Sequence, residues 1–140
     1  MDSFNLQRFV DAQETSYASA LQEIRSGRKR GHWMWYVFPQ LRGLGRTSTS
    51  DFFGIASREE AEAYLAHPTL GARLRECVDA LLAVNGRSAE QIFGLPDVLK
   101  LRSCLTLFAA AAPDDPRFTA ALTKFYEGKP DVNTLQLLDR

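Results

Sequence analysis

The sequence predicts an all-α fold, a compact and irregular bundle of about seven or eight helices in a single domain over residues 1–140. Three observations support this prediction. Helix-start and helix-stop residues follow one another at short intervals along the chain. Between them, apolar residues recur three and four positions apart, which is the spacing of one helix face. No convincing period-two stretch is present, and residues 36–38 are the only short strand candidate.

The first half of the chain predicts two helical stretches and a loop. An amphipathic stripe runs from Leu6 to Ile24, with an expected break near residues 14–16, and Gly27 is its stop signal. The segment from Arg30 to Phe38 is apolar and aromatic on all sides, and a proline ends it. The glycines and hydroxyl residues at positions 43–50 then indicate a loop.

The second half contains clear capping signals. Ser57 and Glu60 are expected to form a capping box, in which each side chain accepts a hydrogen bond from the backbone N–H of the other residue at the start of a helix. His67-Pro68 interrupts this helix early. Ser88 and Gln91 repeat the pattern. The other expected helices are a longer one over Leu70 to Leu82 that stops at Asn85-Gly86, one from Pro96 to the alanine run 109–112, one through Phe118 and Phe125 that stops at Gly128, and a last one capped by Asp131.

Composition is that of an ordinary globular protein. Apolar residues make up 45% and charged residues 24% of the 140 residues, which allows a sizeable core. The formal net charge is zero, so no global field attracts nucleic acid or an anionic membrane. No apolar run approaches the roughly 20 residues that span a bilayer. Cys77 and Cys104 form no CxxC pattern and no signal-peptide pattern opens the chain, so we expect a cytoplasmic protein.

The most distinctive part of the sequence is the run His32-Trp33-Met34-Trp35-Tyr36-Val37-Phe38-Pro39-Gln40, with Gly43-Leu44-Gly45 after it. This run resembles the signature of a bacterial domain-of-unknown-function family, number 1810, whose members are often mislabelled calpastatin. The resemblance covers nearly the whole chain. Its other matching positions are Arg8-Phe9, Ala12-Gln13, Gly27-Arg28-Lys29, Ala61, Tyr64-Leu65, His67-Pro68, Leu70-Gly71, Arg73-Leu74, Phe93-Gly94, Lys100-Leu101, Ser103, Thr106-Leu107-Phe108, Gly128, Asp131 and Thr134-Leu135.

The resemblance implies a compact, mainly helical fold and little more. The family carries no established activity, so no catalytic residue is transferred to this chain and no cofactor is expected. The calpastatin label does not fit, because calpastatins are long, disordered chains and this composition is that of a folded domain. One departure is Gly31, where the family pattern more often has a serine.

The aromatic run has two interpretations. In the first it is a buried helix, in which the large side chains of Trp33 and Trp35 fill the core. In the second it is a pocket wall, where the rings of Trp33, Trp35 and Tyr36 stack on a planar ligand and His32 and Gln40 make polar contacts. Both interpretations can hold for different side chains.

Basic residues lie on both sides of the aromatic run. Lys29 and Arg30 precede it, with Arg25 and Arg28 before them, and two further arginines follow it. Cations at a helix C-terminus ordinarily complement the helix dipole and face solvent. The alternative is an anion site for a phosphate or nucleotide, helped by backbone N–H groups of the Gly43-Leu44-Gly45 loop.

A third candidate group lies on the helix expected after Pro96. Lys100, Ser103 and Thr106 are spaced three apart, so they fall on one helix face. In the plain interpretation, Lys100 pairs with Asp97 on the surface, and the two hydroxyls bond back to helix carbonyls. In the functional interpretation, this face meets His32 across a cleft and Lys100 is a second anion ligand.

The leading hypothesis is therefore a small-molecule site for a phosphorylated or nucleotide-like compound. Its residues are Lys29, Arg30, Trp33, Trp35, Tyr36, Gln40, Lys100, Ser103 and Thr106, with His32 as the catalytic general acid–base of a hydrolytic reaction if the protein is an enzyme. A non-catalytic interaction or homodimerisation module is the alternative. Nucleic-acid binding through Arg25–Arg30 is disfavoured by the zero net charge. No metal site is expected, since the two histidines lie in no ligand-spaced cluster.

Overall fold

The computed structural model describes residues 2–139, and it confirms the all-α prediction. These residues form ten helices and no strand, with one isolated bridge between Leu41 and Ile55. No helix within residues 2–139 is both long and apolar enough to cross a membrane. The helices are α1 (Gln7–Gln13), α2 (Tyr17–Ser26), α3 (Met34–Val37), α4 (Ser48–Phe53), α5 (Arg58–Ala66), α6 (Leu70–Leu82), α7 (Ala89–Phe93), α8 (Asp97–Ala111), α9 (Pro116–Tyr126) and α10 (Val132–Leu138).

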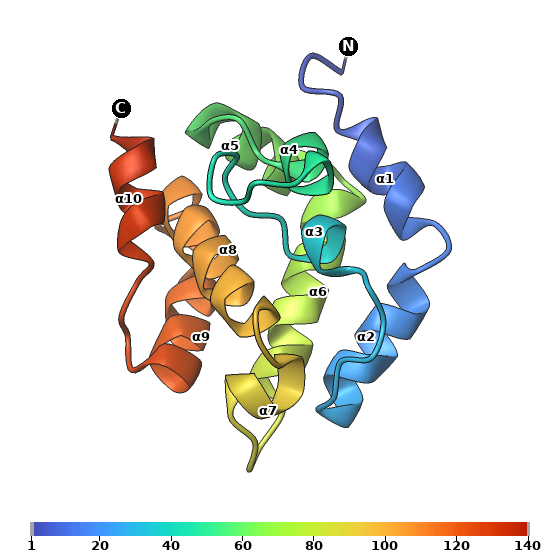
Figure 1. Cartoon of the computed structure of the whole chain (residues 1–140), viewed down its shortest axis with the longest axis vertical. Helices are drawn as coiled ribbons and strands as arrows, with labels where there is room; N and C mark the ends of the chain where they lie inside the picture. The colour runs from blue at the N-terminus through green and yellow to red at the C-terminus, as the bar shows by residue number, and fades with distance from the viewer. Residues whose placement is uncertain (1, 140) are drawn as a thin grey trace.

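Helix α8 is the central element of the bundle (Figure 1). It packs against α5, α7, α9 and α10, while α2 packs against α6 and α1 against α3. Its sequence explains this position, because apolar residues occupy most of its circumference instead of a single stripe. The buried side chains of α8 run from Val98 to Phe108 and include Ser103 and Thr106.

The predicted caps form with one change of partner. The hydroxyl of Ser88 accepts from the Gln91 N–H and the Gln91 side chain accepts from the Ser88 N–H, which completes that capping box. Ser57 also accepts the Glu60 N–H at 3.1 Å. The Glu60 carboxylate, however, turns to the Ala56 N–H at 2.9 Å and to a buried arginine.

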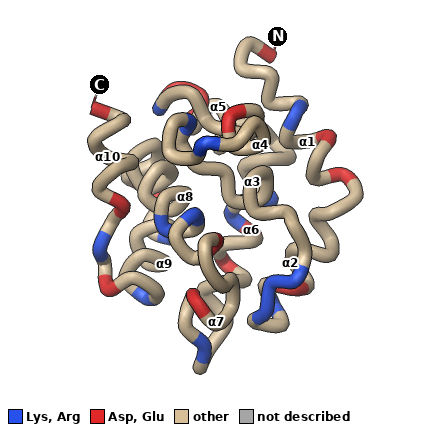
Figure 2. Tube along the Cα trace, in the orientation of Figure 1, with Lys and Arg blue, Asp and Glu red and all other residues tan. Residues whose placement is uncertain are grey.

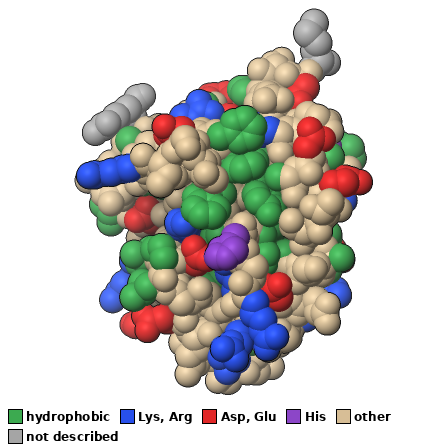
Figure 3. Space-filling view, turned by 45° about the vertical axis from the view of Figure 1, so that its right-hand side comes forward, with side chains coloured by type: hydrophobic (Ala, Val, Ile, Leu, Met, Phe, Trp, Pro, Cys, Tyr) green, Lys and Arg blue, Asp and Glu red, His purple; other side chains and the backbone are tan. Residues whose placement is uncertain are grey.

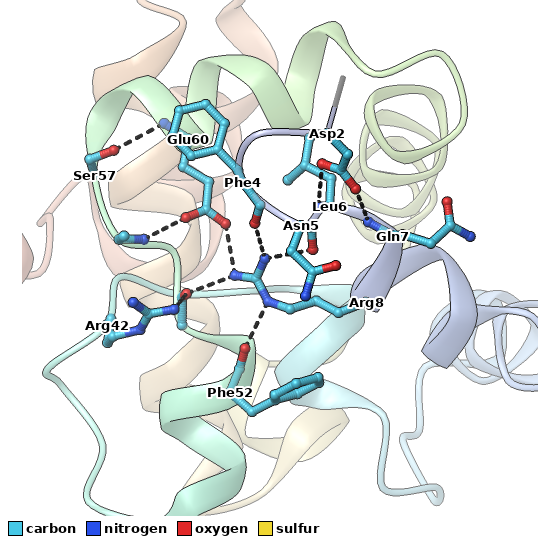
Figure 4. A network of polar contacts seen from close by, with 12 residues as sticks. Asp2, Phe4, Asn5, Leu6, Gln7, Arg8, Arg42, Phe52, Ser57 and Glu60 are labelled. Carbon is cyan, nitrogen blue, oxygen red and sulfur yellow. Dashed lines mark hydrogen bonds and ion pairs between the residues drawn. The ribbon is translucent and has the colours of Figure 1, made fainter.

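That arginine is Arg8, which joins three separate segments of the chain (Figure 4). Its guanidinium donates to the Glu60 carboxylate at 2.7 Å and to the carbonyl oxygens of Phe4, Asn5, Phe52 and Gly54 at 2.6, 2.8, 2.7 and 3.0 Å. The planar group thus has an acceptor for each N–H direction. A buried cation is tolerated here because it is both paired and hydrogen-bonded.

Two local differences separate the structure from the sequence prediction. The first stripe divides at residues 14–16, as expected, but only Met34–Val37 of the aromatic run is helical. In addition, α4 forms where a loop was expected. Thr47 and Ser50 make a reciprocal capping box that starts it, with hydrogen bonds of 3.0 and 3.1 Å. The helix count therefore exceeds seven or eight because of short helices.

Candidate functional site

The segment between α2 and α3 is held in place by Glu23. One carboxylate oxygen of Glu23 accepts from the backbone N–H groups of Arg30 and Gly31 at 2.7 and 2.9 Å, and from the indole N–H of Trp33 at 2.9 Å. Burial opposes ionisation of this carboxyl, but the three hydrogen bonds and the nearby Lys29 charge outweigh it and lower the pKa of Glu23. The loop that carries the predicted basic residues is therefore anchored to α2.

A second anchor joins the same segment to the first turn of α8. The Asp97 carboxylate lies 2.7 Å from the Lys29 ammonium and 3.4 Å from the Lys100 ammonium. Lys29 lies 5.0 Å from the ring centroid of Trp33, and Lys100 lies 4.0 Å from that of Trp35. Both distances are within the range of cation–π contacts. We call this arrangement the Trp–Lys–Asp ladder.

A hollow of about 360 Å³, which we call the Trp35 hollow, lies beside this ladder. This volume is near the lower end of the range of small-molecule sites. Figure 3 shows a histidine between hydrophobic side chains and a group of basic side chains on one face, and Figure 2 shows basic residues gathered just after α2. The hollow is lined by Lys29, Arg30, Gly31, His32, Trp35, Leu95, Pro96, Asp97 and Lys100.

A second hollow of about 300 Å³, the Ser103 hollow, lies next to the first. The two share Pro96 and Lys100, so they form adjacent parts of one groove over the start of α8. The second hollow is more varied in its polar groups, with amides, a hydroxyl and a carboxylate. It is lined by Gln40, Leu44, Gly45, Pro96, Leu99, Lys100, Arg102, Ser103, Asp131 and Asn133.

The groove brings together most of the residues selected from the sequence. Lys29, Arg30, His32 and Trp35 line the Trp35 hollow, Gln40 and Ser103 line the Ser103 hollow, and Lys100 lines both. The polar face of α8 therefore reaches the aromatic run in space. His32 itself is exposed to solvent at the edge of the groove.

Three of the selected residues do not line either hollow. Trp33 is 2% exposed and packs against Phe93 with an edge-on ring contact. Thr106 is also 2% exposed. Tyr36 is half-buried, and its hydroxyl lies 3.0 Å from the hydroxyl of Ser16. Trp33 and Thr106 are therefore part of the packed interior, and Tyr36 lies at its edge.

The hydroxyls of α8 also have structural partners. Ser103 lies 3.2 Å from the Leu99 carbonyl and 3.0 Å from the Asp131 carboxylate, and Thr106 donates to the Arg102 carbonyl at 2.8 Å. Thr106 in turn accepts the Asp131 N–H at 2.8 Å. These contacts fix the start of α10 against α8.

Sequence reasoning missed Asn133 as a lining residue, although it identified Asp131 as a cap. The available signal was the polar first turn of α10, since a capping aspartate followed two residues later by asparagine puts polar groups at one helix end. Within residues 2–139, no three His, Cys, Asp or Glu side chains gather as a metal site. The two cysteines are free thiols in the core.

Comparison with known proteins supports the resemblance carried by the aromatic run. No match is found among curated proteins. The chain is similar to the conserved hypothetical protein Rv1873 from Mycobacterium tuberculosis, known from its crystal structure, with 54% sequence identity, 99% of each chain covered and a TM-score of 0.98. Residues 3–138 match the family described as "Protein of unknown function (DUF1810)". This chain is therefore a member of the DUF1810 family.

Proposed function

We propose that the protein binds a phosphorylated or nucleotide-like small molecule in the Trp35 hollow. The observation that carries the proposal is the convergence of an indole and several cations from two distant segments on one concave surface. Three cationic side chains line this hollow against a single carboxylate, Asp97, which favours an anionic ligand. The ring of Trp35 is half-buried and Lys100 covers one of its faces, so a planar group would stack on the other face.

Arg30 is the cation best suited to reach the ligand. Lys29 has only 8% of its side chain exposed and pairs with Asp97, so its charge is already partly used. Arg30 is exposed, and its backbone is fixed by Glu23. A guanidinium also binds phosphate through two parallel N–H groups, which gives orientation as well as charge.

His32 gives the same site a route to hydrolysis. It is exposed at the edge of the hollow, where it can face both a bound ligand and water. Histidine is the side chain most often used as a general acid–base near neutral pH. Under this proposal, His32→Ala abolishes any turnover of a bound nucleotide derivative but leaves its binding largely intact.

Binding of adenosine 5′-monophosphate, measured by calorimetry and by thermal shift, tests the proposal. We expect the nucleotide to raise the melting temperature of the wild type, because a ligand that binds only the folded state stabilises it. Trp35→Leu and Arg30→Ala each weaken binding by about tenfold or more, through lost stacking and a lost charged hydrogen bond.

Arg46→Ala is the matched control, because Arg46 is an exposed arginine outside both hollows. It should leave the affinity unchanged, and all three variants should keep the circular dichroism spectrum of the wild type. The proposal fails if the wild type binds neither nucleotides nor sugar phosphates at millimolar concentration. It also fails if Trp35→Leu and Arg30→Ala bind as well as Arg46→Ala does.

A second candidate function, homodimerisation, is supported by two exposed leucines that line the groove. Leu95 and Leu99 are 68% and 57% exposed, at the turn before α8 and in its first turn. Exposed apolar side chains on one face are typical of protein interfaces. Sedimentation equilibrium over a range of protein concentrations tests this candidate. We expect the wild type to reach the mass of a dimer and Leu99→Ser to remain a monomer.

For the cellular setting, we propose the cytoplasm. The support is the state of Cys77 and Cys104, which are both buried and unpaired. Free thiols persist in a reducing compartment, where glutathione and thioredoxin keep cysteines reduced.

A further inference from the structure

The two hollows differ in chemistry although they share one wall. The Trp35 hollow offers cations and an indole, whereas the Ser103 hollow offers the amides of Gln40 and Asn133 and the carboxylate of Asp131. Asp97 and Ser103 lie six residues apart on α8, which is about 9 Å along the helix axis. Lys100 lies midway between these two residues on α8 and lines both hollows.

The polar groups of the Ser103 hollow suit hydroxyls better than a second anion. The carboxylate of Asp131 repels a phosphate but accepts hydrogen bonds from neutral hydroxyl groups. Arg102 also lines this hollow, and its Nε–H is already used by the Lys129 carbonyl, at 2.9 Å. The cations of this hollow are Arg102 and Lys100, and Lys100 lies on the border with the Trp35 hollow.

The two amides of this hollow are available for a ligand. Within residues 2–139, no hydrogen bond joins the side chain of Gln40 or Asn133 to another residue. An amide presents both a donor and an acceptor, which is what a sugar hydroxyl needs as a partner. Asn133 is exposed and lies in the first turn of α10, which Asp131 fixes against α8.

From these observations we infer that the ligand is a nucleoside diphosphate sugar, with its sugar in the Ser103 hollow. The base stacks on Trp35, the diphosphate lies along Arg30 and Lys100, and the sugar hydroxyls bond to Gln40, Asn133 and the Asp131 carboxylate. This inference rests on the function proposed above, because it extends the same ligand along the groove.

A pair of probes tests it, ADP and ADP-glucose. ADP-glucose carries glucose on the terminal phosphate and therefore less negative charge than ADP, so tighter binding of ADP-glucose reports contacts of the sugar and not charge. We expect the wild type to bind ADP-glucose about tenfold more tightly than ADP, as a few added hydrogen bonds allow. Asn133→Ala and Gln40→Ala should remove this difference while leaving the affinity for ADP unchanged. Trp35→Leu should weaken both probes equally and keep their ratio.

The outcomes separate the two proposals. Equal affinity of the wild type for ADP and ADP-glucose overturns the sugar site and leaves the nucleotide site standing. A tenfold preference that survives in both Asn133→Ala and Gln40→Ala also overturns it, because the sugar then lies elsewhere. If neither probe binds, the nucleotide site itself is wrong and the sugar site with it.

Discussion

At the scale of single residues, Glu23 determines the shape of the loop that carries Arg30 and His32. One carboxylate oxygen accepts three hydrogen bonds, two of them from backbone groups seven and eight residues further along the chain. Because its pKa is lowered in the folded state, ionised Glu23 stabilises the fold at pH values above its ordinary value of 4.5. That contribution is lost as the pH falls below 4.5 toward the lowered value.

The variant Glu23→Gln tests this linkage, because the amide keeps an acceptor oxygen but cannot ionise. We expect the variant to unfold at a lower urea concentration than the wild type at pH 7, since neutral acceptors bind N–H groups less strongly than charged ones. The difference between the two proteins should shrink as the pH is lowered from 5 to 3. A difference in urea midpoint that stays constant over this range would contradict the role given to the charge.

The sequence allowed candidate site residues to be selected, but it did not show which of them lie together in space. Lys29, Arg30, His32, Trp35 and Lys100 were all selected from the sequence as site residues, and they line one hollow. Their meeting depends on where α8 packs, and helix periodicity carries no information about that. The short helical extent of the aromatic run was also hidden, because the two residues just before it, Arg30 and Gly31, donate their backbone N–H groups to a side chain in α2.

At the scale of helices, α10 is attached to α8 through a small polar cluster. Asp131 caps α10 by accepting the Thr134 N–H at 3.1 Å, and the same carboxylate accepts from Ser103 on α8. The Asp131 N–H donates to Thr106, so two side chains of α8 hold the N-cap residue of α10. The Asp131 carboxylate thus both caps α10 and joins α10 to α8.

Removal of this carboxylate should detach α10 without unfolding the bundle. Asp131→Ala is expected to lower the free energy of unfolding by about 1–2 kcal/mol, the usual effect of a lost cap and hydrogen bond. Hydrogen exchange measured by mass spectrometry should accelerate in residues 132–138 and stay unchanged in α8. As a control, Ser88→Ala removes the cap of α7 and should accelerate exchange only there; uniform acceleration in Asp131→Ala would contradict the local role.

Helix boundaries were the most predictable part of the fold, because capping is a local interaction. Ser57, Ser88 and Asp131 begin helices where the sequence indicated, and Gly27 ends α2 in the left-handed conformation that glycine adopts easily. Helix α4 escaped notice although Thr47 and Ser50 form a capping box, because the surrounding glycines and serines favour a loop.

At the scale of the whole molecule, the two cysteines report on the integrity of the core. Burial raises the pKa of the Cys77 thiol to about 12 and raises that of Cys104 well above its usual range. A thiol that stays protonated and covered does not react, since the thiolate is the nucleophile. Both residues lie in the cluster of side chains that the bundle encloses.

We expect the folded protein to react with Ellman's reagent far more slowly than the chain in urea above its unfolding midpoint. The rate should follow the population of open states as urea is added below the midpoint, because the reagent reaches these thiols only on opening. Cys104→Ser, compared with Cys77→Ser, assigns each phase to one thiol. Rapid labelling of either cysteine in the absence of urea would mean that the core around it is open.

The unequal burial of the two tryptophans gives the molecule an optical reporter at the groove. The sequence contains only these two indoles, and Trp33 is enclosed while Trp35 is half-buried at the hollow. Their fluorescence therefore divides into a part shielded from a dissolved quencher such as iodide and a part open to it. Occupation of the groove changes only the open part, so ligands can be followed without an attached dye.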